Sequence, residues 1–131
     1  MREILFRGKN ADNGKWIEGQ YIRDVSREGT SLSKFAHKIQ PLREQAYAHP
    51  ADPETICQYT GLTDKNGEKI WENDIVVISC EEDEFFIIKW DAETARFILE
   101  SETLVMDFDN YYSYEMDIVG NIFDNPDLLK K

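Results

Sequence analysis

Three runs of β-branched and aromatic residues constrain the fold of this chain most. They span residues 75–80, 84–90 and 96–100, and each has the length of a strand. The charged triplet at 81–83 separates the first two runs, and residues 91–95 separate the last two. Connections this short join antiparallel neighbours, because a parallel crossover needs about a dozen residues. The sequence therefore predicts an antiparallel meander with turns at these two connections.

The apolar residues of these runs are nearly continuous rather than alternating, which is typical of strands covered on both faces. We therefore expect a small barrel packed against another part of the chain. Residues 117–123 read as a further strand, in which Gly120 indicates a bend or a close approach. Asn125 before Pro126 is a favourable helix start, so one or two turns of helix are expected at the C-terminus.

The first 50 residues have weaker strand signals. Residues 3–7 and the segments 15–18 and 20–23, on either side of Gly19, read as short strands. Asn13-Gly14 favours a type I′ hairpin turn before them.

The rest of this portion is more ambiguous. Residues 24–34 are polar and read as a loop. Residues 35–49 have helical spacing, but Pro41 interrupts it, and a short strand at 37–40 fits equally well.

Charge is unevenly distributed along the 131 residues, whose formal net charge is −11. Residues 1–50 hold nine Lys and Arg against six Asp and Glu, whereas residues 51–131 hold six against twenty. A field this negative repels the phosphate backbone that a nucleic-acid binder must neutralise. Direct nucleic-acid binding is therefore not expected, and unlike charges in the two portions favour a homo-oligomer that salt weakens.

Nothing in the sequence indicates a membrane or an oxidising compartment. No apolar run approaches the roughly 18–20 residues of a membrane span, and the N-terminus lacks the apolar core of a secretory signal. Cys57 and Cys80 lie far apart and form no CxxC motif, so both are expected to be reduced. The expected location is the cytoplasm.

The segment 58–76 contains two turn signals and a resemblance to a calcium loop. Counted from Asp64, an EF-hand needs glycine where Lys69 stands and glutamate where Ile75 stands, so a calcium site is not expected. Asn66-Gly67 is instead read as a hairpin turn with positive φ. Asn73-Asp74 is read as a second turn, in which Asp74 accepts backbone N–H bonds.

The residues typical of catalysis or metal binding form no recognisable pattern. His37 and His49, the two histidines, have no helix-spaced metal partner and no adjacent cysteine. The glycines form no phosphate-binding motif. The sequence therefore predicts no catalytic residue, no metal and no cofactor.

The segment 107–117 is the best candidate for partner binding because it mixes aromatic residues, a methionine and acids. Aromatic residues and methionine are enriched at interfaces, and neighbouring acids suit a basic partner. The alternative is that its tyrosines close the core. The candidate contacts are Asp107, Asp109, Tyr111, Tyr112 and Tyr114.

Three segments together resemble the YopX family of phage and prophage proteins. They are MREILFRG (1–8), DPETICQYTGLTDKNGEKIWENDIV (52–76) and IVGNIFDNPDLL (118–129). The resemblance implies an SH3-like barrel over residues 51–131, after an N-terminal portion at 1–50, and a bacterial host cell. It carries over no catalytic residue. The family usually has glycine where this chain has Asn73, and asparagine also tolerates the left-handed region.

The expected function is that of a phage accessory protein that binds protein and is not an enzyme. One alternative is an acidic mimic of DNA that inhibits a host DNA-binding protein, which needs carboxylates spaced along one face. Another is an enzyme with an undescribed site, which needs a concave pocket holding an acid with a shifted pKa.

Overall fold

The computed structural model describes residues 3–42, 47–78, 81–108 and 114–129. The chain divides into two compact units, Met1–Gln58 (unit 1) and Tyr59–Lys131 (unit 2). Antiparallel strands dominate both units, and the helices of the described residues are short 3₁₀ turns. The chain is therefore mostly β, as the sequence predicts.

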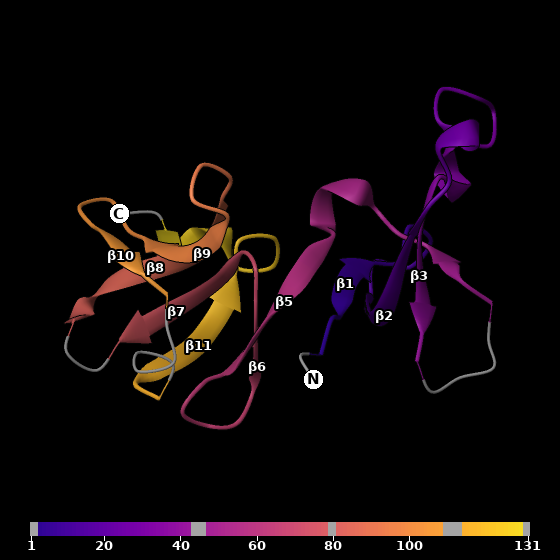
Figure 1. Ribbon diagram of the computed structural model, residues 1–131. Coiled ribbons are helices and arrows are strands. Elements are labelled where there is room, and N and C mark those ends of the chain that lie inside the picture. Colours follow the sequence, from indigo (N-terminus) through magenta and orange to yellow (C-terminus); the bar gives the residue numbers. More distant parts are fainter. Residues whose placement is uncertain (1–2, 43–46, 79–80, 109–113, 130–131) are drawn as a thin grey trace. The chain divides into compact units, whose positions relative to one another are not determined.

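Unit 1 is built on antiparallel strands in the order β4-β3-β2-β1-β5 (Figure 1). An isolated bridge between Asn10 and Ala51 links the segment after β4 back to the end of β1. The strands are β1 (Phe6–Lys9), β2 (Trp16–Arg23), β3 (His37–Pro41), β4 (His49–Pro50) and the start of β5 (Cys57–Thr63).

Several expectations for unit 1 are corrected. The two short strands expected around Gly19 are one continuous strand, β2. Glycine serves there for close approach, because a Cβ at Gly19 would lie 1.9 Å from the backbone oxygen of Gln40 on β3. Within the segment 35–49, which the sequence left open between helix and strand, residues 37–41 form the strand β3. The expected loop at 24–34 contains the 3₁₀ helix η1 (Val25–Arg27), and η2 (Ser33–Phe35) begins within it.

The type I′ turn expected at Asn13-Gly14 is also wrong. Only Gly14 of the pair has a positive φ, of 72°. The last pair of the β1–β2 ladder is Lys9 with Trp16, so the connection is longer than a two-residue turn. The side chain of Asn13 accepts the N–H of Lys15 at 2.9 Å, and this local bond forms without left-handed backbone at Asn13.

Unit 2 contains the predicted meander. Strands β7, β8, β9 and β10 follow one another as antiparallel neighbours, and β11 pairs with the open side of β7, while β6 pairs with β5 (Figure 1). The strands are β6 (Lys69–Trp71), β7 (Asp74–Ile78), β8 (Glu81–Asp91), β9 (Arg96–Glu100), β10 (Val105–Asp107) and β11 (Met116–Asn121).

One of the two expected meander turns is misplaced. The charged triplet at 81–83 belongs to β8, and Glu81 pairs directly with Ile78 of β7. These charged residues therefore begin the strand β8 and do not form the turn before it. The other turn is confirmed, because the β8–β9 ladder ends at the pair Asp91–Arg96. There Ala95 has a φ of 54°.

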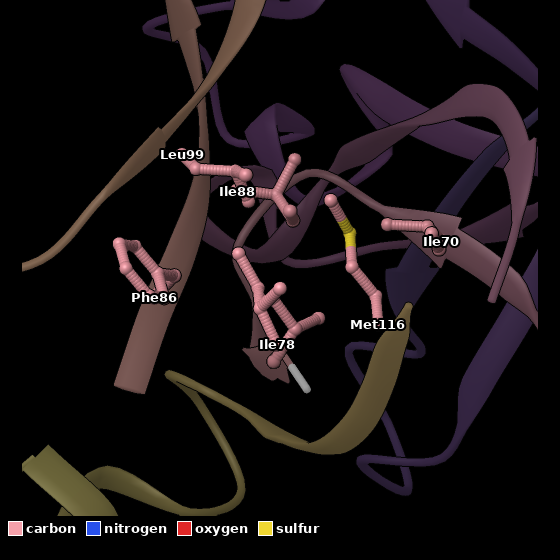
Figure 2. Close-up of a cluster of buried hydrophobic side chains, with 7 residues drawn as sticks. Ile70, Ile78, Phe86, Ile88, Leu99 and Met116 are labelled. Carbon is pink, nitrogen blue, oxygen red and sulfur yellow. The ribbon is translucent and has the colours of Figure 1, made fainter. Parts of the chain in front are cut away.

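The core of unit 2 is a cluster of fully buried side chains that point toward one another (Figure 2). Fully burying one such side chain contributes roughly 1.5–3 kcal/mol. On β7, Ile75 and Val76 point to opposite faces and both are fully buried, so this strand is covered on both faces as expected. The cluster comprises Ile70, Val76, Ile78, Phe86, Ile88, Leu99 and Met116.

The described strands of unit 2 do not form the expected closed barrel. They form an open sheet of order β10-β9-β8-β7-β11. Its two outermost strands, β10 and β11, each pair with one neighbour and not with each other. Closure would require a ladder between β10 and β11, and β10 is only three residues long.

The expected C-terminal helix is instead the single 3₁₀ turn η4 (Pro126–Leu129). The Oδ1 of Asn125 accepts the N–H of Asn121 at 3.2 Å, so this side chain binds the end of β11. A Cβ at Gly120 would lie 2.5 Å from the same oxygen. The close approach expected at Gly120 is therefore confirmed.

Candidate binding surfaces

The predicted turn at Asn66-Gly67 is held by a buried carboxylate. Asp64 accepts the backbone N–H groups of Asn66 at 2.9 Å and Glu68 at 3.0 Å, and its second oxygen accepts that of Ile118 on β11 at 3.2 Å. Only Gly67 has the expected positive φ, of 81°. Because backbone donors occupy both oxygens of Asp64, this acidic loop is a structural support.

The second predicted turn agrees with the structure in its main features. Asn73 has a φ of 71°, in the left-handed region. Asp74 is buried, and its Oδ2 accepts the N–H of Trp71 at 2.8 Å.

Within the described ranges, no group of three or more His, Cys, Asp and Glu residues is arranged to hold a metal ion.

The strongest candidate for a protein-binding surface lies on β8, β10 and the connection before β10. These elements expose large apolar side chains: Phe85 is 40% exposed, Trp90 48%, Leu104 41% and Val105 67%. Exposed apolar side chains gathered on neighbouring elements are typical of interaction sites. We call Phe85, Trp90, Leu104 and Val105, with the charged residues Arg96 and Asp107, the β8–β10 surface. Because side chains alternate along a strand, it has two sides: Trp90 lies on one face of the sheet, and Phe85, Val105, Arg96 and Asp107 lie on the other.

Aromatic packing fixes one corner of the β8–β10 surface. Trp90 is the cross-strand partner of Phe97, with ring centroids 5.0 Å apart in an edge-on arrangement. Phe97 meets Phe108 in the same way at 6.4 Å. Phe97 and Phe108 also pack against the buried core, so Trp90 is an exposed aromatic ring on a rigid support.

The charged side chains of these strands lie on the other face of the sheet from this aromatic corner. Arg96 pairs with Asp107 at 2.7 Å, and both side chains are more than half exposed. The Thr94 hydroxyl, and then the N–H of Glu93, donate to Asp91 and lower the pKa of its carboxyl. Asp91 is therefore ionised at neutral pH. Because side chains alternate along a strand, Arg96 and Asp107 lie on the opposite face of the sheet from Phe97 and Phe108.

The structure covers the predicted partner-binding residues only in part. Asp107 ends β10 and belongs to the β8–β10 surface. Tyr114 precedes β11 and is 71% exposed, so it does not close the core. Asp109, Tyr111 and Tyr112 lie outside the described residues. Sequence reasoning missed Trp90, which it treated only as the end of a strand. An aromatic residue directly before a charged turn was the available signal.

Unit 1 contains a second candidate, a groove of about 440 Å³. It lies where three parts of the chain meet: the β1–β2 connection, the 3₁₀ helix η2, and the segment that follows β4. Its lining residues are Lys9, Asn10, Ala11, Gly14, Ser33, Lys34, His37, Ala51, Asp52 and Pro53.

His37 links this groove to a hydrogen-bonded network. Its Nδ1 lies 2.5 Å from the hydroxyl of Tyr21, and the two rings stack with centroids 5.9 Å apart. Its Nε2 lies 3.8 Å from Glu28, which also accepts from Arg23 at 2.6 Å. Burial raises the pKa of Tyr21, so its hydroxyl remains protonated and can donate to His37.

The remaining residues that could carry chemistry are placed without forming a site. Cys57 is buried, and its Sγ lies 3.2 Å from the backbone oxygen of Thr55. Cys80 lies outside the described residues. His49 is the cross-strand partner of Ile39. Among the residues that the structure describes, no helix has the length and apolar character needed to span a bilayer.

Comparison with known proteins gives a family and a fold. Among curated proteins, no sequence matches this chain. The crystal structure of protein EF1440 from Enterococcus faecalis is similar, with a TM-score of 0.62 and 22% sequence identity over 99% of this chain and 100% of that one. The sequence model of the YopX protein family matches residues 5–130. The chain therefore belongs to the YopX family.

Proposed function

We propose that this chain is a non-enzymatic accessory protein of a phage or prophage that acts by binding a basic protein of the host cell. The β8–β10 surface carries this proposal. It offers a supported, half-exposed tryptophan on one face of the sheet and exposed apolar residues with Asp107 on the other, and the ionised Asp91 directly follows the tryptophan. Tryptophan is enriched among the few residues that carry most of the binding energy of protein interfaces.

Charge supports a basic partner. Unit 2 holds eighteen Asp and Glu against six Lys and Arg. A surface within such a field attracts cationic proteins and repels nucleic acid. An arginine or lysine of the partner would stack on the ring of Trp90, where cation–π attraction adds about 0.5–1 kcal/mol at exposed sites.

The fold proposed for unit 2 remains SH3-like, although open. A meander whose final strand returns to pair with the first strand, as β11 pairs with β7, supports this arrangement. Such a sheet provides a rigid support for exposed side chains on its faces and edges.

The test is affinity capture from host-cell lysate, followed by titration with the purified captured protein. We expect wild-type protein to retain a basic protein whose binding weakens as salt rises. Trp90→Ser should weaken binding by about tenfold or more, the loss expected of an interface anchor. Asp107→Asn should weaken it less, because Asp107 already pairs with Arg96.

The matched control is Tyr47→Ser in unit 1, which removes an aromatic ring that is 92% exposed. It should leave binding unchanged. Equal losses in the Tyr47 and Trp90 variants would contradict the proposal, as would a retained protein that is acidic. A different outcome would be that double-stranded DNA competes with this chain for the captured protein. The chain would then act as a mimic of DNA.

A further inference from the structure

We propose that the segment of the partner that binds unit 2 is extended and basic, and that it adds to the sheet as an antiparallel strand along the outer edge of β10. This inference rests on the proposed function and names the mode of binding and the chemistry of the bound segment. The segment places a lysine or arginine opposite Asp107 and an apolar residue beside Phe108.

The two outer edges of the sheet differ. At the β11 edge, Met116 accepts the backbone N–H of Lys65 at 3.0 Å. Ile118 of the same strand donates its N–H to Asp64 at 3.2 Å. β10 forms the other edge (Figure 1), and among the residues that the structure describes no strand pairs with its outer side. An edge strand in this state is a template for a further strand.

The register of the β9–β10 hairpin decides which backbone groups point toward this edge. Ser101 donates its N–H to the backbone oxygen of Leu104 at 2.9 Å, so these residues form a hydrogen-bonded pair. Bonded and non-bonded pairs alternate along an antiparallel ladder. Val105 and Asp107 are therefore in non-bonded pairs with β9, and their N–H and C=O groups point away from it. An added strand would meet one donor and one acceptor from each of them.

A row of alternating charges on one face of the sheet ends at this edge. Asp91 of β8 is the cross-strand partner of Arg96 of β9. Arg96 in turn lies 2.7 Å from the Oδ1 of Asp107 on β10. A positive charge on the next strand would continue the alternation, and opposite charges on neighbouring strands attract. Asp107 can accept a second cation, because its side chain is 64% exposed and a carboxylate has two acceptor oxygens.

A row of aromatic rings on the other face ends at the same edge. Trp90 of β8 packs on Phe97 of β9, and Phe97 packs on Phe108, which directly follows β10. Phe108 is only partly buried, so an apolar residue of the added strand can cover it further. Because side chains alternate along a strand, a segment in which apolar and basic residues alternate meets both rows.

The test is a titration of the whole chain with a short synthetic peptide in which valine and lysine alternate, at constant ionic strength. We expect saturable amide NMR shifts centred on Val105 and Asp107. A matched peptide with glutamate in place of lysine should bind at least about tenfold more weakly, because it brings like charges together beside Asp107. No saturable shift, or equal binding of the two peptides, would overturn the proposal.

Methylation of the peptide backbone separates strand addition from general attraction. In antiparallel pairing, the lysines opposite Val105 and Asp107 donate their own N–H groups to this edge, whereas the N–H groups of the valines point away. Methylating the lysine N–H groups should therefore abolish binding. Methylating those of the valines should raise the dissociation constant by about twofold at most. Equal losses, or a larger loss from the methylated valines, would count against strand addition.

Variants of the protein test the edge from its other side. Val105→Pro removes an N–H that points to the edge and none that bonds to β9, and proline is tolerated at such positions. It should raise the dissociation constant of the peptide by about tenfold or more. Val105→Thr keeps this N–H, so the constant should rise by only about twofold. If the proline variant does not fold, the methylated peptides decide the point.

The charge is tested by a matched pair of acids in unit 2. Asp107→Asn should raise the dissociation constant of the peptide by about threefold, as expected for an exposed ion pair. Glu93→Gln removes an exposed acid from the turn between β8 and β9 and should leave it unchanged. Equal effects of the two variants would show general attraction instead of a site.

The same variants distinguish this inference from the proposed function. With the captured basic protein in place of the peptide, a loss in Trp90→Ser without one in Val105→Pro would overturn strand addition and leave the proposed function standing. The peptide titrations need no captured protein, so they decide strand addition even where none is retained. If Val105→Pro instead dissociates a homodimer of the wild type, measured by light scattering, the edge binds a second copy of this chain and the proposal is wrong.

Discussion

The two units of this chain differ in both core and charge. Unit 2 buries a compact apolar cluster and carries a large excess of acids. Unit 1 is nearly balanced, with nine Lys and Arg against eight Asp and Glu. Ile39 is its one large aliphatic side chain with no exposure among the described residues. Unit 1 also depends on a close backbone contact at Gly19 and on bonds within its loops.

This difference shows how one small chain can present two kinds of surface. A well-filled core lets unit 2 expose Trp90 and tolerate dense negative charge. The loops of unit 1 enclose a groove with cationic donors. Three sets of stability measurements on variants test whether the two units are stabilised in these different ways.

The largest effect is expected from Phe86→Ala in the core of unit 2. Phe86 is fully buried, so the cavity should lower the free energy of unfolding by about 3–5 kcal/mol. Phe85→Ala is the matched control, because Phe85 lies next to it on the other face and is 40% exposed. It should cost about 1 kcal/mol or less. Urea unfolding measures both, and similar losses would contradict the described core.

A smaller effect is expected from two glycine substitutions, one in each unit. In Gly19→Ala the new Cβ would meet a backbone oxygen, which cannot move without breaking the β2–β3 ladder, so we expect a loss of about 3 kcal/mol. In Gly120→Ala it would meet Asn125. The Oδ1 and Cγ of Asn125 can rotate away at the loss of the bond to Asn121, and its Cβ, 2.9 Å away, needs only a small backbone shift. That loss should be about 1–2 kcal/mol. Thermal unfolding of both variants compares them, and the reverse order would show that unit 1 is the more adaptable.

The smallest effects are expected at the turn before β7. Asp74→Ala should cost about 1–2 kcal/mol, because the buried N–H of Trp71 loses its acceptor. Asn73→Gly should be neutral or mildly stabilising, because glycine adopts a φ of 71° without strain. Urea unfolding beside the parent protein tests the pair. A loss above about 1 kcal/mol for Asn73→Gly, with none for Asp74→Ala, would contradict this account of the turn.

Prediction from sequence succeeded where local chemistry decides the structure. The β-branched runs became β7, β8 and β9 because these side chains suit a pleated strand covered by apolar neighbours. Asn73 took the left-handed conformation, and Asp74 accepted a backbone N–H, because few residue types can do either.

Prediction failed where distant segments decide the structure. Nothing near Gly19 in the sequence indicates that the backbone of Gln40 lies against it, so one strand was read as two. The charged triplet at 81–83 was assigned to a turn because charge alone does not reveal pairing with Ile78. Barrel closure was expected from apolar runs, which show that a strand is covered but not which element covers it.

By itself, the sequence determined the strand-rich class of the fold, the main strands of unit 2 and the acidic character of that half. Each depends on residue type and short-range spacing. The tertiary structure alone decided that Trp90 packs on Phe97, which in turn packs on Phe108, and that His37 and Lys34 line one groove. These placements depend on ladder register and loop closure, which bring together residues that are far apart in the chain.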